Sequence, residues 1–114
     1  MLLFYKFQQN NTYGRWQFVE GVLGYAVYVQ AYTAAQANEI AQELGIYFDG
    51  CASDHDCECC GDRWSRVDDS DGKEVPLLYG EPLEAAAKKL LFKLPIYIHF
   101  RDGRVEEFCP PSQK

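Results

Sequence analysis

The amino-acid sequence predicts one α+β domain over residues 1–114, with a mainly antiparallel sheet, two helices and a long loop rich in cysteine and aspartate. Three observations lead to this prediction. Runs of β-forming residues lie near both ends of the chain, two internal segments carry apolar residues at helical spacing, and a long polar stretch separates those segments. A chain of 114 residues is also the usual size of a single domain.

The N-terminal part predicts a meander of three strands. Residues 2–8 are mostly aromatic and aliphatic, and they end at a polar stretch whose Asn and Gly residues suit a turn. Residues 15–19 and 25–32 are the next two expected strands, and the second of them, YAVYVQAY, is a dense run of β-formers. Consecutive strands joined by short turns would pair in order.

Two helices are expected from capping residues and periodicity. Thr33 and Gln36 have the spacing of a capping box, which satisfies the first backbone N–H groups of a helix. Apolar residues follow at helical spacing, so the first helix is placed at residues 34–44. Pro82 suits the first turn of a second helix, and Pro95 would end that helix.

The C-terminal part predicts a β-hairpin. Apolar and polar residues alternate from Ile96 to Arg101. Asp102 and Gly103 follow, a favoured pair for a two-residue turn. This turn would set His99 opposite Glu106, so we expect a polar cross-strand pair on the solvent face of the sheet.

Composition and charge restrict the class of function. The formal net charge is -6 and the pI about 4.8, which argues against binding a nucleic-acid polymer but leaves small anions possible. No apolar run is long enough for a membrane span, and the N-terminal residues become polar too early for a signal peptide. Five cysteines, an odd number, favour reduced thiols or metal ligands over a disulfide framework. We expect a soluble cytoplasmic protein.

The long segment between the helices, residues 46–79, is the expected functional region, since it is longer than a connection needs to be. Within it, Cys57 and Cys60 followed by Gly61 match the C-x-x-C-G turn of zinc sites. The other zinc ligands would have to come from Cys51, His55, Cys59 or Cys109, and none of these forms a second such pair. Zinc and a loop of reduced thiols therefore both remain open.

Enzyme chemistry is the less favoured interpretation of this region. A thiol near His55 could act as a nucleophile with a base, but the neighbouring acids are expected to raise the pKa of a thiol. No carboxylates are paired specifically for acid–base work. We therefore expect a protein that does not catalyse a reaction.

A binding role fits the residue types better. The guanidinium of Arg63 can hold a phosphate or carboxylate, and Trp64 and Tyr47 offer flat faces for a base. Arg15 and Trp16 repeat the Arg-Trp pair near the N-terminus. The alternative is that these aromatic residues serve only in core packing.

Three stretches of the sequence carry a resemblance to a known family. They are YKFQQNN at residues 5–11, GIYFDG at residues 45–50 and DCECCGDRW at residues 56–64. Together they resemble a family of small tailed-phage proteins of uncharacterised function. The resemblance implies an accessory protein made in the host bacterial cytoplasm. Small α+β phage proteins of this size include ones that sequester the nucleotide signals of bacterial immunity.

The expectation that follows is a non-enzymatic, oligomeric protein that binds a cyclic dinucleotide or an ADP-ribose derivative. Zinc is the one candidate cofactor, at Cys57 and Cys60. The alternative function is a protein-interaction module, with or without zinc, that binds and inhibits a host protein; hydrolysis of the signal is a third. The expected ligand-binding residues are Asn10, Asn11, Arg15, Trp16, Tyr47, Asp62, Arg63 and Trp64.

Overall fold

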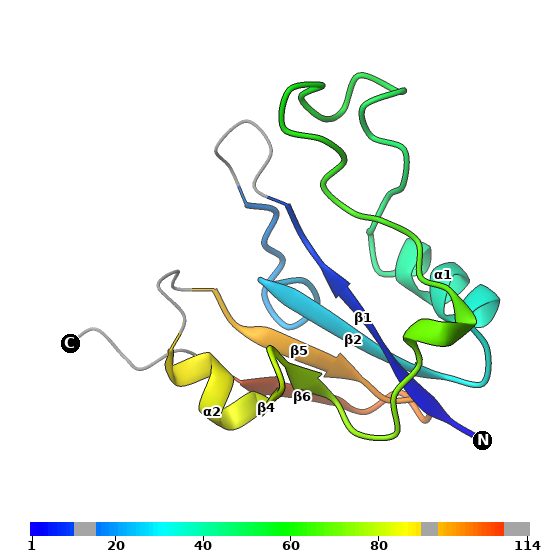
Figure 1. The fold of residues 1–114 in the computed structure, drawn as a ribbon, viewed down its shortest axis with the longest axis vertical. Coiled ribbons are helices and arrows are strands. Elements are labelled where there is room, and N and C mark those ends of the chain that lie inside the picture. Colours follow the sequence, from blue (N-terminus) through cyan, green and yellow to red (C-terminus); the bar gives the residue numbers. More distant parts are fainter. Residues whose placement is uncertain (11–15, 90–93, 109–114) are drawn as a thin grey trace.

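The computed structural model describes residues 1–10, 16–89 and 94–108, and these form a mixed four-stranded sheet covered on both faces (Figure 1). The strand order is β1-β2-β5-β6. The β1–β2 and β5–β6 pairs are antiparallel, and the central β2–β5 pair is parallel. The expected α+β class is therefore confirmed. The strands are β1 (Leu3–Gln8), β2 (Ala26–Ala31), β5 (Ile96–His99) and β6 (Val105–Phe108).

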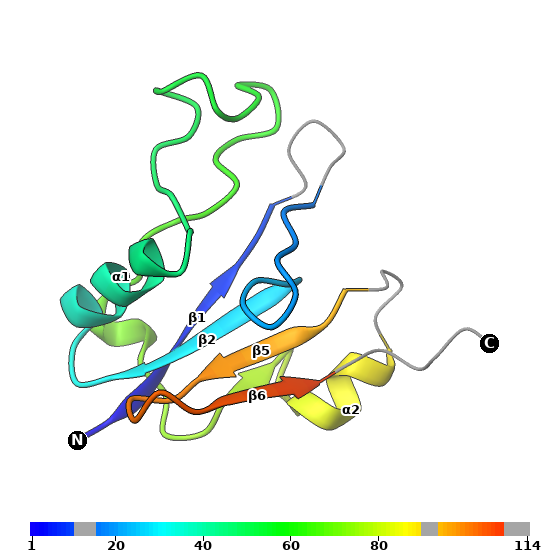
Figure 2. The same cartoon turned by 180° about the vertical axis from the view of Figure 1, so that it is seen from behind.

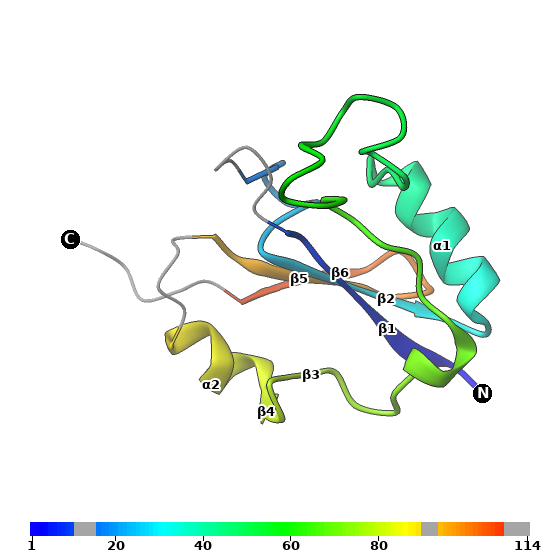
Figure 3. The same cartoon turned by 45° about the horizontal axis from the view of Figure 1, so that its top comes forward.

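One face of the sheet is covered by helix α1 (Ala34–Glu43), as Figure 3 shows. The N-cap is Thr33, as predicted, and its hydroxyl accepts the backbone N–H of Gln36 at 3.1 Å. The Gln36 side chain accepts the N–H of Tyr32. The buried alanines of α1 let it lie close to the sheet, and the core on this face includes Tyr5, Phe7, Val27, Val29 and Trp64.

The opposite face is covered by a short hairpin and a second helix (Figure 3). The hairpin pairs β3 (Leu77–Leu78) with β4 (Glu81–Pro82), and α2 (Leu83–Lys88) follows directly. The helix was expected to continue to Pro95, but its C-cap is already Lys89; residues 90–93 lie outside the described part. No helix in the described ranges is long and apolar enough to cross a membrane.

The expected three-stranded meander is wrong. Residues 16–18 form no regular strand, and Val19 makes only an isolated bridge to Leu23 around a tight turn. A strand distant in the sequence explains the difference: β5 pairs with β2 in parallel and occupies the edge of β2 that is not paired with β1. Gly24 permits this close approach, since a Cβ at this position would lie 2.1 Å from the carbonyl oxygen of Pro95.

The C-terminal hairpin is confirmed, but its expected register is wrong by one residue. His99 lies opposite Val105, not Glu106. Gly103 has φ 94° and its N–H bonds to the carbonyl of Phe100, so the loop has three residues with glycine in the left-handed position. The extra loop residue shifts the pairing. His99 is also buried rather than solvent-facing, because the segment around Val22 lies over this face of β5; the His99 Nε2 is 2.8 Å from the Val22 carbonyl oxygen.

Candidate functional site

A buried ion pair holds the two halves of the cysteine-rich loop together. The Asp56 carboxylate accepts the Tyr47 hydroxyl at 2.6 Å and the backbone N–H of Arg63 at 2.8 Å. The Arg63 Nε lies 3.8 Å from the same carboxylate and donates to the Tyr47 hydroxyl at 3.1 Å. Its terminal nitrogen donates to the Gln9 side chain at 3.1 Å. We call Gln9, Tyr47, Asp56 and Arg63 the loop brace.

The tip of the loop is tied to the end of β1. The Asn10 backbone N–H donates to the Arg63 carbonyl at 2.8 Å, and its side-chain amide donates to the Cys60 carbonyl. On the far side, the Asp62 carboxylate accepts the backbone N–H of Cys51 at 2.9 Å. Hydrogen bonds from the Cys51 backbone N–H and thiol lower the pKa of Asp62. The loop therefore has a defined shape.

Trp64 anchors the same loop in the core. Its side chain is 1% exposed, and its indole N–H donates to the Gln17 side chain at 2.7 Å. Arg63 is 8% exposed. The expectation that the loop offers Arg63 and Trp64 at its surface is therefore wrong, while their part in ligand binding stays a prediction.

The other predicted ligand residues are dispersed. Asn10, Tyr47 and Asp62 lie beside the brace, as described above. Trp16 lies on the opposite face of the sheet, with its ring 5.5 Å from that of Tyr25. Asn11 and Arg15 fall outside the described residues. Of the described residues among them, Tyr47 and Arg63 belong to the loop brace, and Trp16 lies apart from it.

The thiols of the loop differ in acidity. Hydrogen bonds from the backbone N–H and thiol of Cys60, and from the N–H of Cys59, lower the pKa of Cys57. Burial and the nearby Asp62 raise the pKa of Cys51 to about 11. The expectation that neighbouring acids raise the pKa of a thiol near His55 is wrong for Cys57. No disulfide joins the described cysteines, and no group of three or more potential ligands among the described residues could hold a metal.

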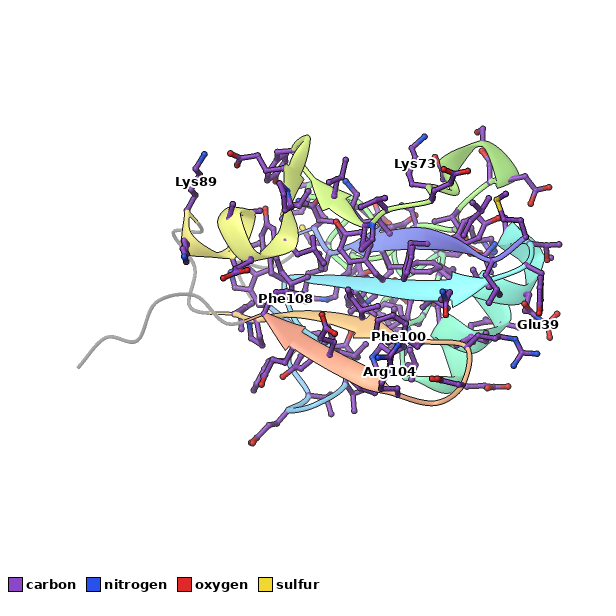
Figure 4. All side chains as sticks on the ribbon, turned by 90° about the horizontal axis from the view of Figure 1, so that it is seen from below. Glu39, Lys73, Lys89, Phe100, Arg104 and Phe108 are labelled. Carbon is purple, nitrogen blue, oxygen red and sulfur yellow. The ribbon has the colours of Figure 1, made fainter. Side chains whose placement is uncertain are left out.

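A groove of about 840 Å³ lies along the outer side of β1, where sequence analysis predicted no site. Its inner wall is formed by Phe4, Lys6 and Gln8 of β1 together with Tyr28 of β2, and its outer wall by residues within 65–67 and 71–80. We call it the β1 groove. Figure 4 shows Lys73 on this outer segment beside β1, with its side chain extending away from the sheet.

Three polar side chains meet at one end of the β1 groove. The Gln8 amide donates to the Tyr79 hydroxyl at 2.8 Å and to the Tyr25 hydroxyl at 3.0 Å, and the two hydroxyls are 2.8 Å apart. The hydrogen bond with Tyr25 lowers the pKa of Tyr79; burial opposes this shift, while Gln8 and the Lys6 ammonium add to it. Burial raises the pKa of Tyr25 to about 12.

Tyr79 also has an unfavourable backbone conformation. It has φ 54° and is followed by Gly80 with φ 78°, and the two residues form the turn between β3 and β4. A non-glycine residue in this region costs about 1–2 kcal/mol. Such strain often occurs at functional sites. In this protein, the strained turn places the Tyr79 hydroxyl at the groove, although Tyr79 is 67% exposed.

Replacing Tyr79 by Asn is expected to give a more stable protein than replacing it by Phe, by about 1 kcal/mol. Both changes remove the hydroxyl, but only Asn suits the left-handed backbone of this turn. Urea unfolding of the two variants measures the difference. If the Asn variant were the less stable one, packing of the aromatic ring would outweigh the backbone strain.

The backbone edge of β1 opens into the same groove. Other segments bond to this edge near its two ends: Phe4 exchanges two backbone hydrogen bonds with Lys73, of 2.7 and 3.0 Å, and Asn10, just after β1, donates one of 2.8 Å to Arg63. Lys6 and Gln8 lie between these places. Because backbone groups of alternate residues point to the same side of a strand, the N–H and C=O groups of both residues point away from β2, as those of Phe4 do. Neither residue's outward backbone groups bond to another described residue.

Comparison with known proteins identifies a family but no activity. Among curated proteins and solved structures, none matches the chain. A family match covers almost the whole length, from residue 2 to residue 113. The chain therefore belongs to the family described as a domain of unknown function, DUF7296.

Proposed function

We propose that this protein is a phage accessory protein that binds a nucleotide-type signal of bacterial immunity and holds it without cleaving it, and that the β1 groove is the binding site. The phage origin and the class of signal rest on the resemblance carried by the DCECCGDRW motif. The assignment of the site is supported by the lining of the groove, which combines lysines with aromatic rings and hydroxyl groups.

The dimensions and lining of the groove suit a nucleotide. Its volume of about 840 Å³ lies in the range of small-molecule sites, roughly 300–1,000 Å³. Lys6 and Lys73 supply positive charge for a phosphate in a chain of net charge -6, although the Lys73 ammonium points away from the sheet and donates to the Ser70 carbonyl at 3.4 Å, so it would have to turn toward the ligand. Phe4 and Tyr28 supply aromatic surface for a base.

Two neighbouring charged groups are already engaged within the protein. Arg66 pairs with Asp49 at 2.9 Å and stacks over Phe48 at 4.9 Å. The Asp71 carboxylate accepts the backbone N–H of Asp68 at 2.7 Å.

Replacing Lys6 or Lys73 by Ala is expected to weaken nucleotide binding by about 10–100-fold, the usual effect of losing one charge-assisted hydrogen bond. Lys88→Ala, on the exposed side of α2, is the matched control and is expected to bind like the unmodified protein. Native mass spectrometry and calorimetry with a panel of cyclic dinucleotides and ADP-ribose derivatives measure the change. Absence of binding to every member, or equal binding by all variants, would contradict the proposal. Recovery of a cleaved ligand would favour hydrolysis.

The open edge of β1 favours a second candidate, the protein-interaction module. Unpaired backbone groups on an edge strand can accept an extended segment of another protein as an additional strand. Comparing Lys6→Ala with Lys6→Pro separates the two functions, because only proline removes the backbone N–H. Loss of nucleotide binding in both variants supports the nucleotide site. Capture of a host protein by the Ala variant but not by the Pro variant supports strand addition.

A further inference from the structure

The side chains of Gln8 and Tyr79 each leave one polar atom for a ligand at the end of the β1 groove where they meet Tyr25. Both amide hydrogens of Gln8 are used, since its Nε2 donates to the Tyr25 hydroxyl at 3.0 Å and to the Tyr79 hydroxyl at 2.8 Å. The Gln8 atom that remains is its carbonyl oxygen, a hydrogen-bond acceptor. Gln8 and Tyr79 line the groove, whereas Tyr25 is buried.

The Tyr79 hydroxyl is the second of these atoms. The two phenol oxygens are 2.8 Å apart, so one hydroxyl donates to the other. When Tyr25 donates, the Tyr79 oxygen accepts from Tyr25 and Gln8 and keeps its own hydrogen for the groove. When Tyr79 donates, its oxygen keeps one lone pair for the groove. In either orientation the Tyr79 hydroxyl makes one further hydrogen bond, as a donor or as an acceptor.

This end of the groove suits hydroxyl groups of a ligand better than phosphate. An ionised phosphate only accepts hydrogen bonds, and these two atoms together offer at most one donor. A hydroxyl both donates and accepts, so it matches either the Gln8 carbonyl oxygen or the Tyr79 hydroxyl. The two atoms are neighbours, because Tyr79 is bonded to the amide nitrogen of the same Gln8 group. Two hydroxyls on adjacent carbons therefore reach both.

A positive charge lies beside this polar end. Lys6 and Gln8 are two residues apart on β1, so their side chains lie on one face, about 7 Å apart along the strand. The Lys6 ammonium suits a phosphate. A phosphate beside two adjacent hydroxyls is the arrangement of a ribose 5′-phosphate whose 2′- and 3′-hydroxyls are both free.

The β3–β4 hairpin holds Tyr79 at this end of the groove. The hairpin lies on the near side of the sheet in Figure 1 and on the far side in Figure 2. The Tyr28 hydroxyl donates to the Leu77 carbonyl, which ties the hairpin to β2. Tyr79 follows in the strained turn, with its hydroxyl bonded to Gln8. Since this side chain is already in place, little ordering of it is needed when a ligand binds.

We propose that the β1 groove binds a nucleotide of the ADP-ribose type, with two adjacent ribose hydroxyls at Gln8 and Tyr79 and the adjoining phosphate at Lys6. This inference rests on the proposed function and narrows it. In a cyclic dinucleotide, one hydroxyl of each ribose is esterified to phosphate, so the free pair of adjacent hydroxyls is missing. The polar end of the groove therefore separates the two ligand classes that the proposed function allows.

The test is calorimetry of the full chain with two probes that share the adenine base, ADP-ribose and a 3′,5′-linked cyclic diadenylate. ADP-ribose is expected to bind at least about tenfold more tightly, the effect of one or two hydrogen bonds. Tighter binding of the cyclic diadenylate would overturn this inference and leave the proposed function standing. Absence of ADP-ribose binding would also overturn it, whereas the proposed function falls only if the whole nucleotide panel fails to bind.

Matched tyrosine variants locate the hydroxyl. Tyr79→Phe is expected to weaken ADP-ribose binding by roughly 3–10-fold, the loss of one neutral hydrogen bond, and to leave the weaker binding of the cyclic diadenylate unchanged. Tyr32→Phe is the control, because Tyr32 is exposed and is not among the residues that line the groove. Circular dichroism checks that both variants fold. Equal ADP-ribose affinity of the two variants, or an equal loss for both probes in Tyr79→Phe, would overturn the assignment.

Discussion

Replacing Arg63 by Ala is expected to lower the free energy of unfolding by about 3–5 kcal/mol, because the Asp56 carboxylate would stay buried without its cationic neighbour. The two side chains are 9% and 0% exposed. The Tyr47 hydroxyl and the Gln9 side chain would each lose a donor at the same time. Urea unfolding followed by tryptophan fluorescence measures the change, since Trp64 is the next residue and is buried.

The matched control for this prediction is Arg66→Ala. Arg66 also pairs with an aspartate, Asp49, at 2.9 Å, but the two side chains are 55% and 61% exposed. An exposed pair contributes about 0–1 kcal/mol. Similar small losses in both variants would contradict the role of Arg63 in the loop brace. A stable Arg63→Ala protein that no longer binds nucleotides would instead support the ligand-binding role expected from the sequence.

The elements that sequence analysis predicted well depend on local patterns. The strands β1 and β2 are dense runs of β-formers, and α1 has an N-cap and a side-chain acceptor three residues later. For each, the residues that decide the structure lie within the element or next to it. Their bounds were accordingly predicted to within one residue.

The elements that sequence analysis predicted wrongly depend on partners distant in the chain or on the backbone conformation of a turn. Residues 15–19 resemble a strand, but β5 occupies the place beside β2. The pair Asp102-Gly103 fits a two-residue turn and a three-residue loop equally well, and only the observed bonding of Phe100 distinguishes them. The burial of His99 depends on a distant segment, because Val22 lies over it and its carbonyl bonds to the imidazole.

The candidate site illustrates the same distinction. Sequence analysis selected the DCECCGDRW motif, but it could not show which residues face inward, because their partners Gln9, Gln17 and Tyr47 lie far away in the chain. In the folded protein, the acids, arginine and tryptophan at the ends of the motif form its support, and the cysteines lie at its tip. The β1 groove was missed because it forms between segments that share no motif.

Replacing Trp64 by Ala is expected to cost about 3–5 kcal/mol, as is usual for a large aromatic residue lost from a core. Since small domains have only about 5–15 kcal/mol of stability, this variant should unfold at a much lower temperature. Trp64→Phe retains most of the apolar packing but loses the 2.7 Å bond to Gln17, so a smaller cost is expected. Phe18, 46% exposed, provides the control, since Phe18→Ala should change stability by less than about 0.5 kcal/mol. Thermal unfolding followed by circular dichroism gives the order of the variants, and equal midpoints for Trp64→Ala and Phe18→Ala would show that the loop does not depend on this anchor.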